Sequence, residues 1–193
     1  MGKTYPVLDQ RLRDFIARQH MFFVATAPLS AVGRINLSPK GLDSFAILDD
    51  STVAYLDLTG SGIETVAHLR ENTRIVIMLC AFDGPPLILR LHGRGHVLES
   101  AHPEFASLLS RFPPHDGVRS IIRVALERIS DSCGYGVPLY DFKSERTQLP
   151  AWVARKGPQG IAAYQREYGA CSIDGLPGLP SVAPSPPSAL PRA

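Results

Sequence analysis

In two segments of the chain, an apolar run is followed by small and polar residues, which is a pattern often found where a protein binds an anion. Asn36–Gly41 closes one expected strand, and Tyr55–Gly62 carries another strand into Thr59, Gly60, Ser61 and Gly62 at the start of an expected helix. Strand ends and helix N-termini present backbone N–H groups, so they can hold an anion without a cluster of basic side chains. A capped helix with a glycine turn and no ligand would look the same in sequence.

Lys40 lies just past the first of these strands in this reading, between Pro39 and Gly41. It could pair with a phosphate, although a lone lysine in a loop is more often solvated. Gly60-Ser61-Gly62 has only two of the three glycines of a dinucleotide fingerprint, because Thr65 stands where the third would be. No P-loop motif follows either segment.

Other chemistry-bearing residues are weaker candidates. His92 and His96 share one face of an expected strand, but four residues there span about 13 Å, too far to share one zinc ion. We therefore expect no metal site. Cys133 lies in a glycine-rich turn where reactive groups can occur, but no motif indicates a covalent mechanism, and no catalytic residue can be assigned.

Composition is ordinary for a globular domain. The chain has 193 residues, of which 45% are hydrophobic and 20% charged, with a net charge of +2. This balance argues against nucleic acid and against a membrane surface as partners. Three cysteines without paired spacing, no apolar signal region and no apolar stretch near twenty residues indicate a cytoplasmic location.

One helix, several short strands, a helix, longer strands and final helices follow one another, and so many strands with few helical crossovers are typical of an antiparallel barrel with peripheral helices. Strands are expected at 21–27, 33–39, 45–48, 52–58, 74–82, 87–99 and 120–129. Helices are expected at 6–20, 61–72, 102–112, 147–156 and 158–168, with Ser61 and Glu64 as a capping box for the second. Prolines crowd the C-terminal end, so we expect one domain over 1–178 and a disordered tail over 179–193.

In order and spacing, several of these pieces resemble the pyridoxamine 5′-phosphate oxidase-related family of FMN-binding split barrels. The resemblance covers about residues 6–178. It rests on Phe23–Ala27, Asn36–Gly41, Tyr55–Thr65, His68–Asn72 with Arg74, Leu89–Gly95, Ser132–Pro138 and Ser172–Pro177.

The resemblance implies a mainly β fold, a six-stranded antiparallel split barrel of Greek-key type, with FMN as cofactor. It also implies a homodimer with FMN at the subunit interface. It places Ser38, Pro39 and Lys40 beside the flavin ring or ribityl chain, and Thr59, Gly60, Ser61, Gly62 and Thr65 near the phosphate.

The chain also departs from the name-giving oxidases. They carry an Arg-Lys pair in the region where this chain has Ile63-Glu64-Thr65, and an arginine where it has Ile35. Their closing Arg-x-His motif is replaced by Ser172–Pro177 and a proline-rich tail. Pyridoxamine phosphate oxidase activity itself is therefore not expected.

The resulting hypothesis is an FMN-binding oxidoreductase that transfers hydride or electrons between the flavin and a small molecule that the sequence does not identify. Lys40 is the first candidate to sit near the flavin N1 and C2 carbonyl, and Cys133, Tyr135 and the histidine face are candidates for its open side. The alternative is a protein that binds or senses flavin, haem or a deazaflavin without turnover, and a third possibility is an interaction protein with no cofactor.

Overall fold

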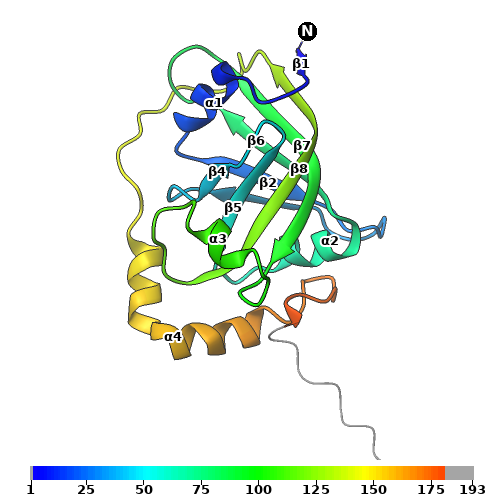
Figure 1. Cartoon of the computed structure of the whole chain (residues 1–193), viewed down its shortest axis with the longest axis vertical. Coiled ribbons are helices and arrows are strands. Elements are labelled where there is room, and N and C mark those ends of the chain that lie inside the picture. The colour runs from blue at the N-terminus through cyan, green and yellow to red at the C-terminus, as the bar shows by residue number, and fades with distance from the viewer. Residues whose placement is uncertain (1, 181–193) are drawn as a thin grey trace, which may run out of the picture.

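The computed structural model describes residues 2–180, and its centre is one curved antiparallel sheet that forms a half-barrel (Figure 1). In the described residues six strands have five or more residues, and two short strands add to them. The strands are β1 Thr4–Tyr5, β2 Phe22–Thr26, β3 Asn36–Lys40, β4 Phe45–Ile47, β5 Thr52–Leu58, β6 Arg74–Cys80, β7 Ile88–Leu98 and β8 Val118–Ser132. The expected antiparallel split barrel with peripheral helices is thus confirmed.

The sheet runs in the order β3-β2-β6-β7-β8-β5-β4, and β1 pairs with β8. Because β3 and β4 end this path, each has one unpaired edge. β3 pairs with β2 so that Asn36 lies opposite Thr26 and Lys40 opposite Phe22. Lys40 is therefore the last residue of β3, whereas the sequence placed it just past the strand.

Helices lie around the sheet rather than between its strands (Figure 1). They are α1 Gln10–Ala17, α2 Glu64–Asn72, α3 Phe105–Leu109 and α4 Gln148–Tyr168. α4 consists of two helical pieces joined at Gly157, whose φ of 64° only glycine adopts readily, and this matches the two expected helices. α1 begins later than expected because Asp9 caps it by accepting a hydrogen bond from the Leu12 N–H.

The main hydrophobic core fills the concave side of the sheet under α1 and α2. Leu12 from α1, Val66 from α2 and Ile77 from β6 are fully buried within it. Leu179 also belongs to this core and is 2% exposed. The sequence placed the end of the domain one residue earlier, at residue 178. Residues 181–193, which hold most of the expected disordered tail, lie outside the described residues.

Between β8 and α4 the chain crosses one side of the molecule without regular structure, and we call residues 138–147 the strap (Figure 1). Irregular connections of this length are uncommon in compact domains and often carry function. The strap is important because it borders the Lys40 end of β3.

Candidate functional site

Alternate residues of β3 face the interior of the half-barrel. Asn36, Ser38 and Lys40 are partly buried, whereas Leu37 and Pro39 point outward and are exposed. Four residue steps separate Asn36 from Lys40, so the inward face spans about 13 Å. The Ser38 Oγ atom is buried in the middle of this face and has no hydrogen-bond partner. A buried hydroxyl without a partner is rare in a folded protein and is a plausible contact for a ligand group.

The Asn36 end of β3 is tied to helix α2 by side-chain hydrogen bonds. The Asn36 amide donates to Thr65 Oγ1 at 3.0 Å and to Thr26 Oγ1 at 3.2 Å. Thr26 Oγ1 also lies 3.0 Å from His68 Nδ1, while His68 Nε2 has no partner although its side chain is fully buried. These contacts bring two of the predicted segments, Asn36–Gly41 and the start of α2, side by side.

The loop between β5 and α2 presents its backbone N–H groups without internal partners. In the described part of the chain, no hydrogen bond engages any backbone N–H from residue 60 to residue 66. Gly60, Ser61 and Gly62 are exposed, and Thr65 lies in the first turn of α2. A run of free amides at a helix N-terminus is a favourable environment for an anion.

Arg119 of β8 holds this loop in shape through hydrogen bonds to two of its carbonyl oxygens. Its guanidinium donates to the carbonyl oxygens of Gly62 at 2.9 Å and Gly60 at 3.3 Å. The same group makes two hydrogen bonds to the Asp57 carboxylate, at 2.8 and 3.0 Å. Both side chains of this pair are almost fully buried, with 5% and 1% exposure. Because two loop carbonyls are turned inward toward Arg119, the loop is held in one conformation.

The buried pair of Arg119 and Asp57 also sets the protonation state of the Asp57 carboxylate. Burial acts to raise the pKa of Asp57, but the charge and hydrogen bonds of Arg119 outweigh it and hold the pKa below its ordinary value. Asp57 therefore remains ionised and neutralises the nearby guanidinium. Arg119 supplies geometry to the loop more than it supplies net positive charge.

Thr59 has a different environment from its neighbours in the loop. Its hydroxyl donates to the Gly117 carbonyl at 2.7 Å and accepts from Gln165 of α4 at 2.8 Å, and the residue is 1% exposed. These bonds already use the hydroxyl to hold the end of β5 against α4. Among the residues predicted to lie near a phosphate, Thr59 is therefore the one with the least freedom to turn toward a ligand.

The expected capping box at α2 is wrong. Ile63 is the N-cap residue, and no side chain caps the helix. Glu64 instead accepts a hydrogen bond from the Ile173 N–H at 3.2 Å, and its carboxylate lies beside Gly62. The cause is the C-terminal segment, which returns to α2 and offers its own N–H group to Glu64.

Acidic side chains surround the buried His68. Burial lowers the pKa of His68, while the charges of Glu64, Glu71 and Asp174 act to raise it, and burial prevails. Asp174 is itself ion-paired with Arg34. The Asn36 end of β3 thus offers free amides but also carries carboxylates that would repel an anion.

The Lys40 end of β3, about 13 Å from the Asn36 end, borders an open cavity. Pro39 and Lys40 line a cavity of about 550 Å³ together with the strap and the ends of β2 and β6. The Lys40 side chain forms no ion pair or hydrogen bond in the described part of the chain, although its charge helps to lower the pKa of Asp57. Its ammonium is available to a ligand that lies along β3.

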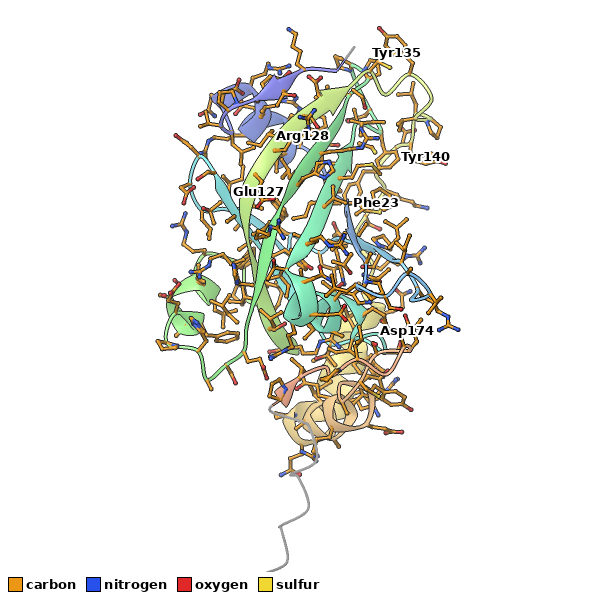
Figure 2. The ribbon with its side chains drawn as sticks, turned by 90° about the vertical axis from the view of Figure 1, so that its right-hand side faces the viewer. Phe23, Glu127, Arg128, Tyr135, Tyr140 and Asp174 are labelled. Carbon is orange, nitrogen blue, oxygen red and sulfur yellow. The ribbon has the colours of Figure 1, made fainter. Side chains whose placement is uncertain are left out.

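Other candidate residues lie elsewhere. His92 and His96 are exposed on the outer face of β7, as their alternation predicted. Tyr135 and Cys133 are exposed beyond the end of β8, and Figure 2 shows Tyr135 at the opposite end of the molecule from Asp174. The structure does not bring these four residues to the inward face of β3.

The described residues show neither a metal centre nor a membrane-spanning helix. They contain no group of three histidine, cysteine, aspartate or glutamate side chains arranged to hold a metal ion. None of their helices is long and apolar enough to cross a membrane.

Sequence reasoning missed Arg119, Asp57, His68 and Gln165 as parts of the site. The available signal was weak: Asp57 is a charged residue inside an otherwise apolar strand, and Arg119 begins another strand. Only the pairing of β5 with β8, which sets Asp57 opposite Ser120, brings the two charges together.

Comparison with known proteins gives consistent results. The family model described as pyridoxamine 5′-phosphate oxidase matches residues 8–133. A protein of Aspergillus flavus named pyridoxamine 5′-phosphate oxidase family protein ustO is 41% identical over 195 residues, covering 92% of this chain and 78% of that protein.

Two solved structures are similar in fold. A variant of HupZ from Group A Streptococcus is 26% identical, with a TM-score of 0.50, over 65% of this chain and 99% of the other. A protein of Lactobacillus delbrueckii, named as a candidate pyridoxamine 5′-phosphate oxidase, has a TM-score of 0.52 at 17% identity. That match covers 66% of this chain and 98% of the other.

Proposed function

The chain belongs to the pyridoxamine 5′-phosphate oxidase family, and from this premise we propose that it binds FMN alongside β3 and acts as an oxidoreductase. The observation that carries the proposal is the buried Ser38 hydroxyl without a partner, midway between a run of free amides and an unpaired lysine. FMN is an elongated molecule with a phosphate at one end and a ring at the other. The two ends of β3 match this division.

In the proposal, the phosphate lies at the Asn36 end. Ser61, Thr65 and the backbone amides of Gly60 and Gly62 would hold it, with Arg119 keeping the loop in shape from below. Thr59 would support the loop through Gln165 rather than contact the phosphate. The Glu64 carboxylate lies beside Gly62 while it accepts the Ile173 N–H, so it would have to turn away for a phosphate to approach.

The flavin ring lies at the Lys40 end in the same proposal. Ser38 would donate its unused hydroxyl to the ligand, and Pro39 and Lys40 would flank the ring. A bound flavin supplies hydride transfer, whereas the protein supplies orientation and electrostatics. A cation near the ring stabilises the negative charge of the reduced form, and Lys40 is the residue placed to do this.

We further propose that two copies associate through the β3 edge, with the flavin between them, in the cytoplasm. Support comes from large apolar side chains that the monomer leaves exposed on β3 and its neighbouring loops. They are Leu29, Val32, Ile35, Leu37 and Ile173, each between 65% and 92% exposed. Light scattering of the purified protein, with and without FMN, tests this association.

The function is tested by an absorption spectrum followed by anaerobic reduction. We expect flavin bands after FMN titration, release of FMN on denaturation, and bleaching of the bands by NADH or NADPH. A protein that stays colourless after titration contradicts the flavin proposal. Flavin bands that neither nucleotide bleaches indicate the alternative, a binding or sensing protein. A haem band in place of flavin bands would identify haem as the cofactor instead of FMN.

A further inference from the structure

A second cavity, of about 590 Å³, lies between α1, β4 and the strap, on the side of the molecule where the strap runs (Figure 1). Its volume falls in the range of small-molecule sites. Its walls are mainly apolar. They include Ile16, Ala17, Phe22, Phe45, Ile47 and Phe142.

One aromatic stack separates this cavity from the cavity at Lys40. The His20 and Phe142 rings lie face to face, with centroids 3.6 Å apart and planes 9° apart, and both cavities touch them. From Asp141 to Arg146 the strap makes no hydrogen bond to the rest of the described chain. Phe142 therefore anchors the strap mainly by stacking, and the wall that it forms can adjust to a ligand.

The two cavities differ in charge. Four cationic residues, Arg18, Lys40, Lys143 and Arg146, line the first cavity, together with three carboxylates. Two exposed carboxylates, Asp43 and Glu145, line the second cavity, and no lysine or arginine lines it; Glu145 also lines the first cavity. Neither carboxylate has an ion pair or a hydrogen bond in the described residues. An apolar cavity with unpaired negative charge favours a cation.

The backbone at the rim forms a left-handed turn that includes one of these two residues. Leu42 and Asp43 have φ angles of 60° and 51°, a left-handed conformation that is uncommon for residues other than glycine. The Ser44 hydroxyl closes this turn by donating to the Gly41 carbonyl at 2.6 Å. Strained turns of this kind recur at ligand-binding sites.

From these observations we propose that the second cavity binds a small organic amine, with an apolar or aromatic body against Ile16, Phe45 and Ile47 and its ammonium group between Asp43 and Glu145. The apolar walls supply affinity for the body, and the carboxylates select the positive charge. Glu145 also lies close to Gly41, which places its carboxylate at the rim opposite α1. The proposal does not depend on flavin binding.

Three probes that share an indole ring distinguish the effect of ligand charge on affinity from the effect of ligand shape. They are tryptamine, indole-3-acetamide and indole-3-acetate. Binding to the purified full chain is measured by calorimetry or ligand-observed NMR, without added FMN. We expect tryptamine to bind about tenfold more tightly than indole-3-acetate, with the neutral amide between them.

Charge-removing variants test the assigned residues. Asp43→Asn and Glu145→Gln should each weaken tryptamine about threefold and leave indole-3-acetamide unchanged. Asp116→Asn, an exposed carboxylate away from the cavity, serves as the matched control and should change neither. Equal binding of the three probes, no binding of tryptamine, or tryptamine affinity insensitive to both variants overturns the proposal.

Discussion

The two ends of strand β3 differ in how firmly their surroundings are fixed. At the Asn36 end, hydrogen bonds from Asn36 and Arg119 hold helix α2 and the preceding loop, and most side chains are buried. At the Lys40 end, the adjoining strap is exposed, and ring stacking and one hydrogen bond from the Tyr140 N–H to the Phe82 carbonyl hold it. A fixed end suits a group that stays bound, such as a cofactor phosphate, whereas an open end suits ligands that exchange.

The largest expected effect comes from the substitution Arg119→Met, which removes the hydrogen bonds that hold the loop at the Asn36 end. Removing this partner leaves the Asp57 carboxylate buried and unpaired, which should lower the free energy of unfolding by about 3–5 kcal/mol. It should also release the loop carbonyls and weaken FMN binding. Urea unfolding measures the stability, and fluorescence titration of FMN at a temperature where the variant is folded measures the affinity.

The matched control for that variant is Arg94→Met. Arg94 pairs with Glu127 on the surface, where both side chains are about half exposed. Loss of such a pair changes stability by about 0–1 kcal/mol. If both variants lose the same stability, the buried pair does not have the role that we assign to it.

Lys40→Gln tests the open end. Removing the cation should lower the midpoint potential of bound flavin by about 20 mV, equivalent to about 1 kcal/mol for a two-electron couple, and should change FMN affinity little. Potentiometric titration measures this shift. Lys143→Gln, a strap residue that lines the same cavity, is the control; a potential that moves equally in both variants removes the special role of Lys40.

Ser38→Ala should weaken ligand binding without lowering the stability of the FMN-free protein. Because the Ser38 hydroxyl has no partner in the chain, its removal should leave the stability of the FMN-free protein unchanged or slightly higher. FMN binding should weaken by about 1 kcal/mol, or roughly fivefold, through loss of one hydrogen bond. Unchanged FMN affinity would remove Ser38 from the site.

Glu64→Gln should strengthen FMN binding, because it removes a negative charge beside Gly62 and the free amides. The expected gain is about 0.3–1 kcal/mol and should shrink as salt is added. Titrations of both proteins at low and high ionic strength measure it. Weaker binding in the variant would place the phosphate elsewhere.

The smallest expected effect is the contribution of His68 to the pH dependence of the free energy of unfolding. Burial lowers its pKa in the folded protein, so the unfolded chain binds a proton first as pH falls. The His68 contribution is fully present above the unfolded pKa of about 6.5, and stability should decline as pH falls below that value. Unfolding curves between pH 5 and 8 measure the slope, which should flatten in His68→Gln; an equal slope in both proteins contradicts this assignment.

Part of this account was predictable from the sequence. The alternation of β7 and the glycine joint at Gly157 followed from residue pattern and spacing. The role of Glu64 did not, because it depends on Ile173, which lies more than a hundred residues later in the chain. The same holds for the strap and its cavities, since long-range packing creates them.

The most direct test of the central claim compares FMN with riboflavin, which lacks only the phosphate. If the free amides before α2 hold the phosphate while β3 holds the ring, FMN should bind at least about tenfold more tightly than riboflavin, or about 1.4 kcal/mol. Fluorescence quenching on titration of the purified protein measures both affinities. Equal affinities for the two flavins, or no binding of either, would contradict the account.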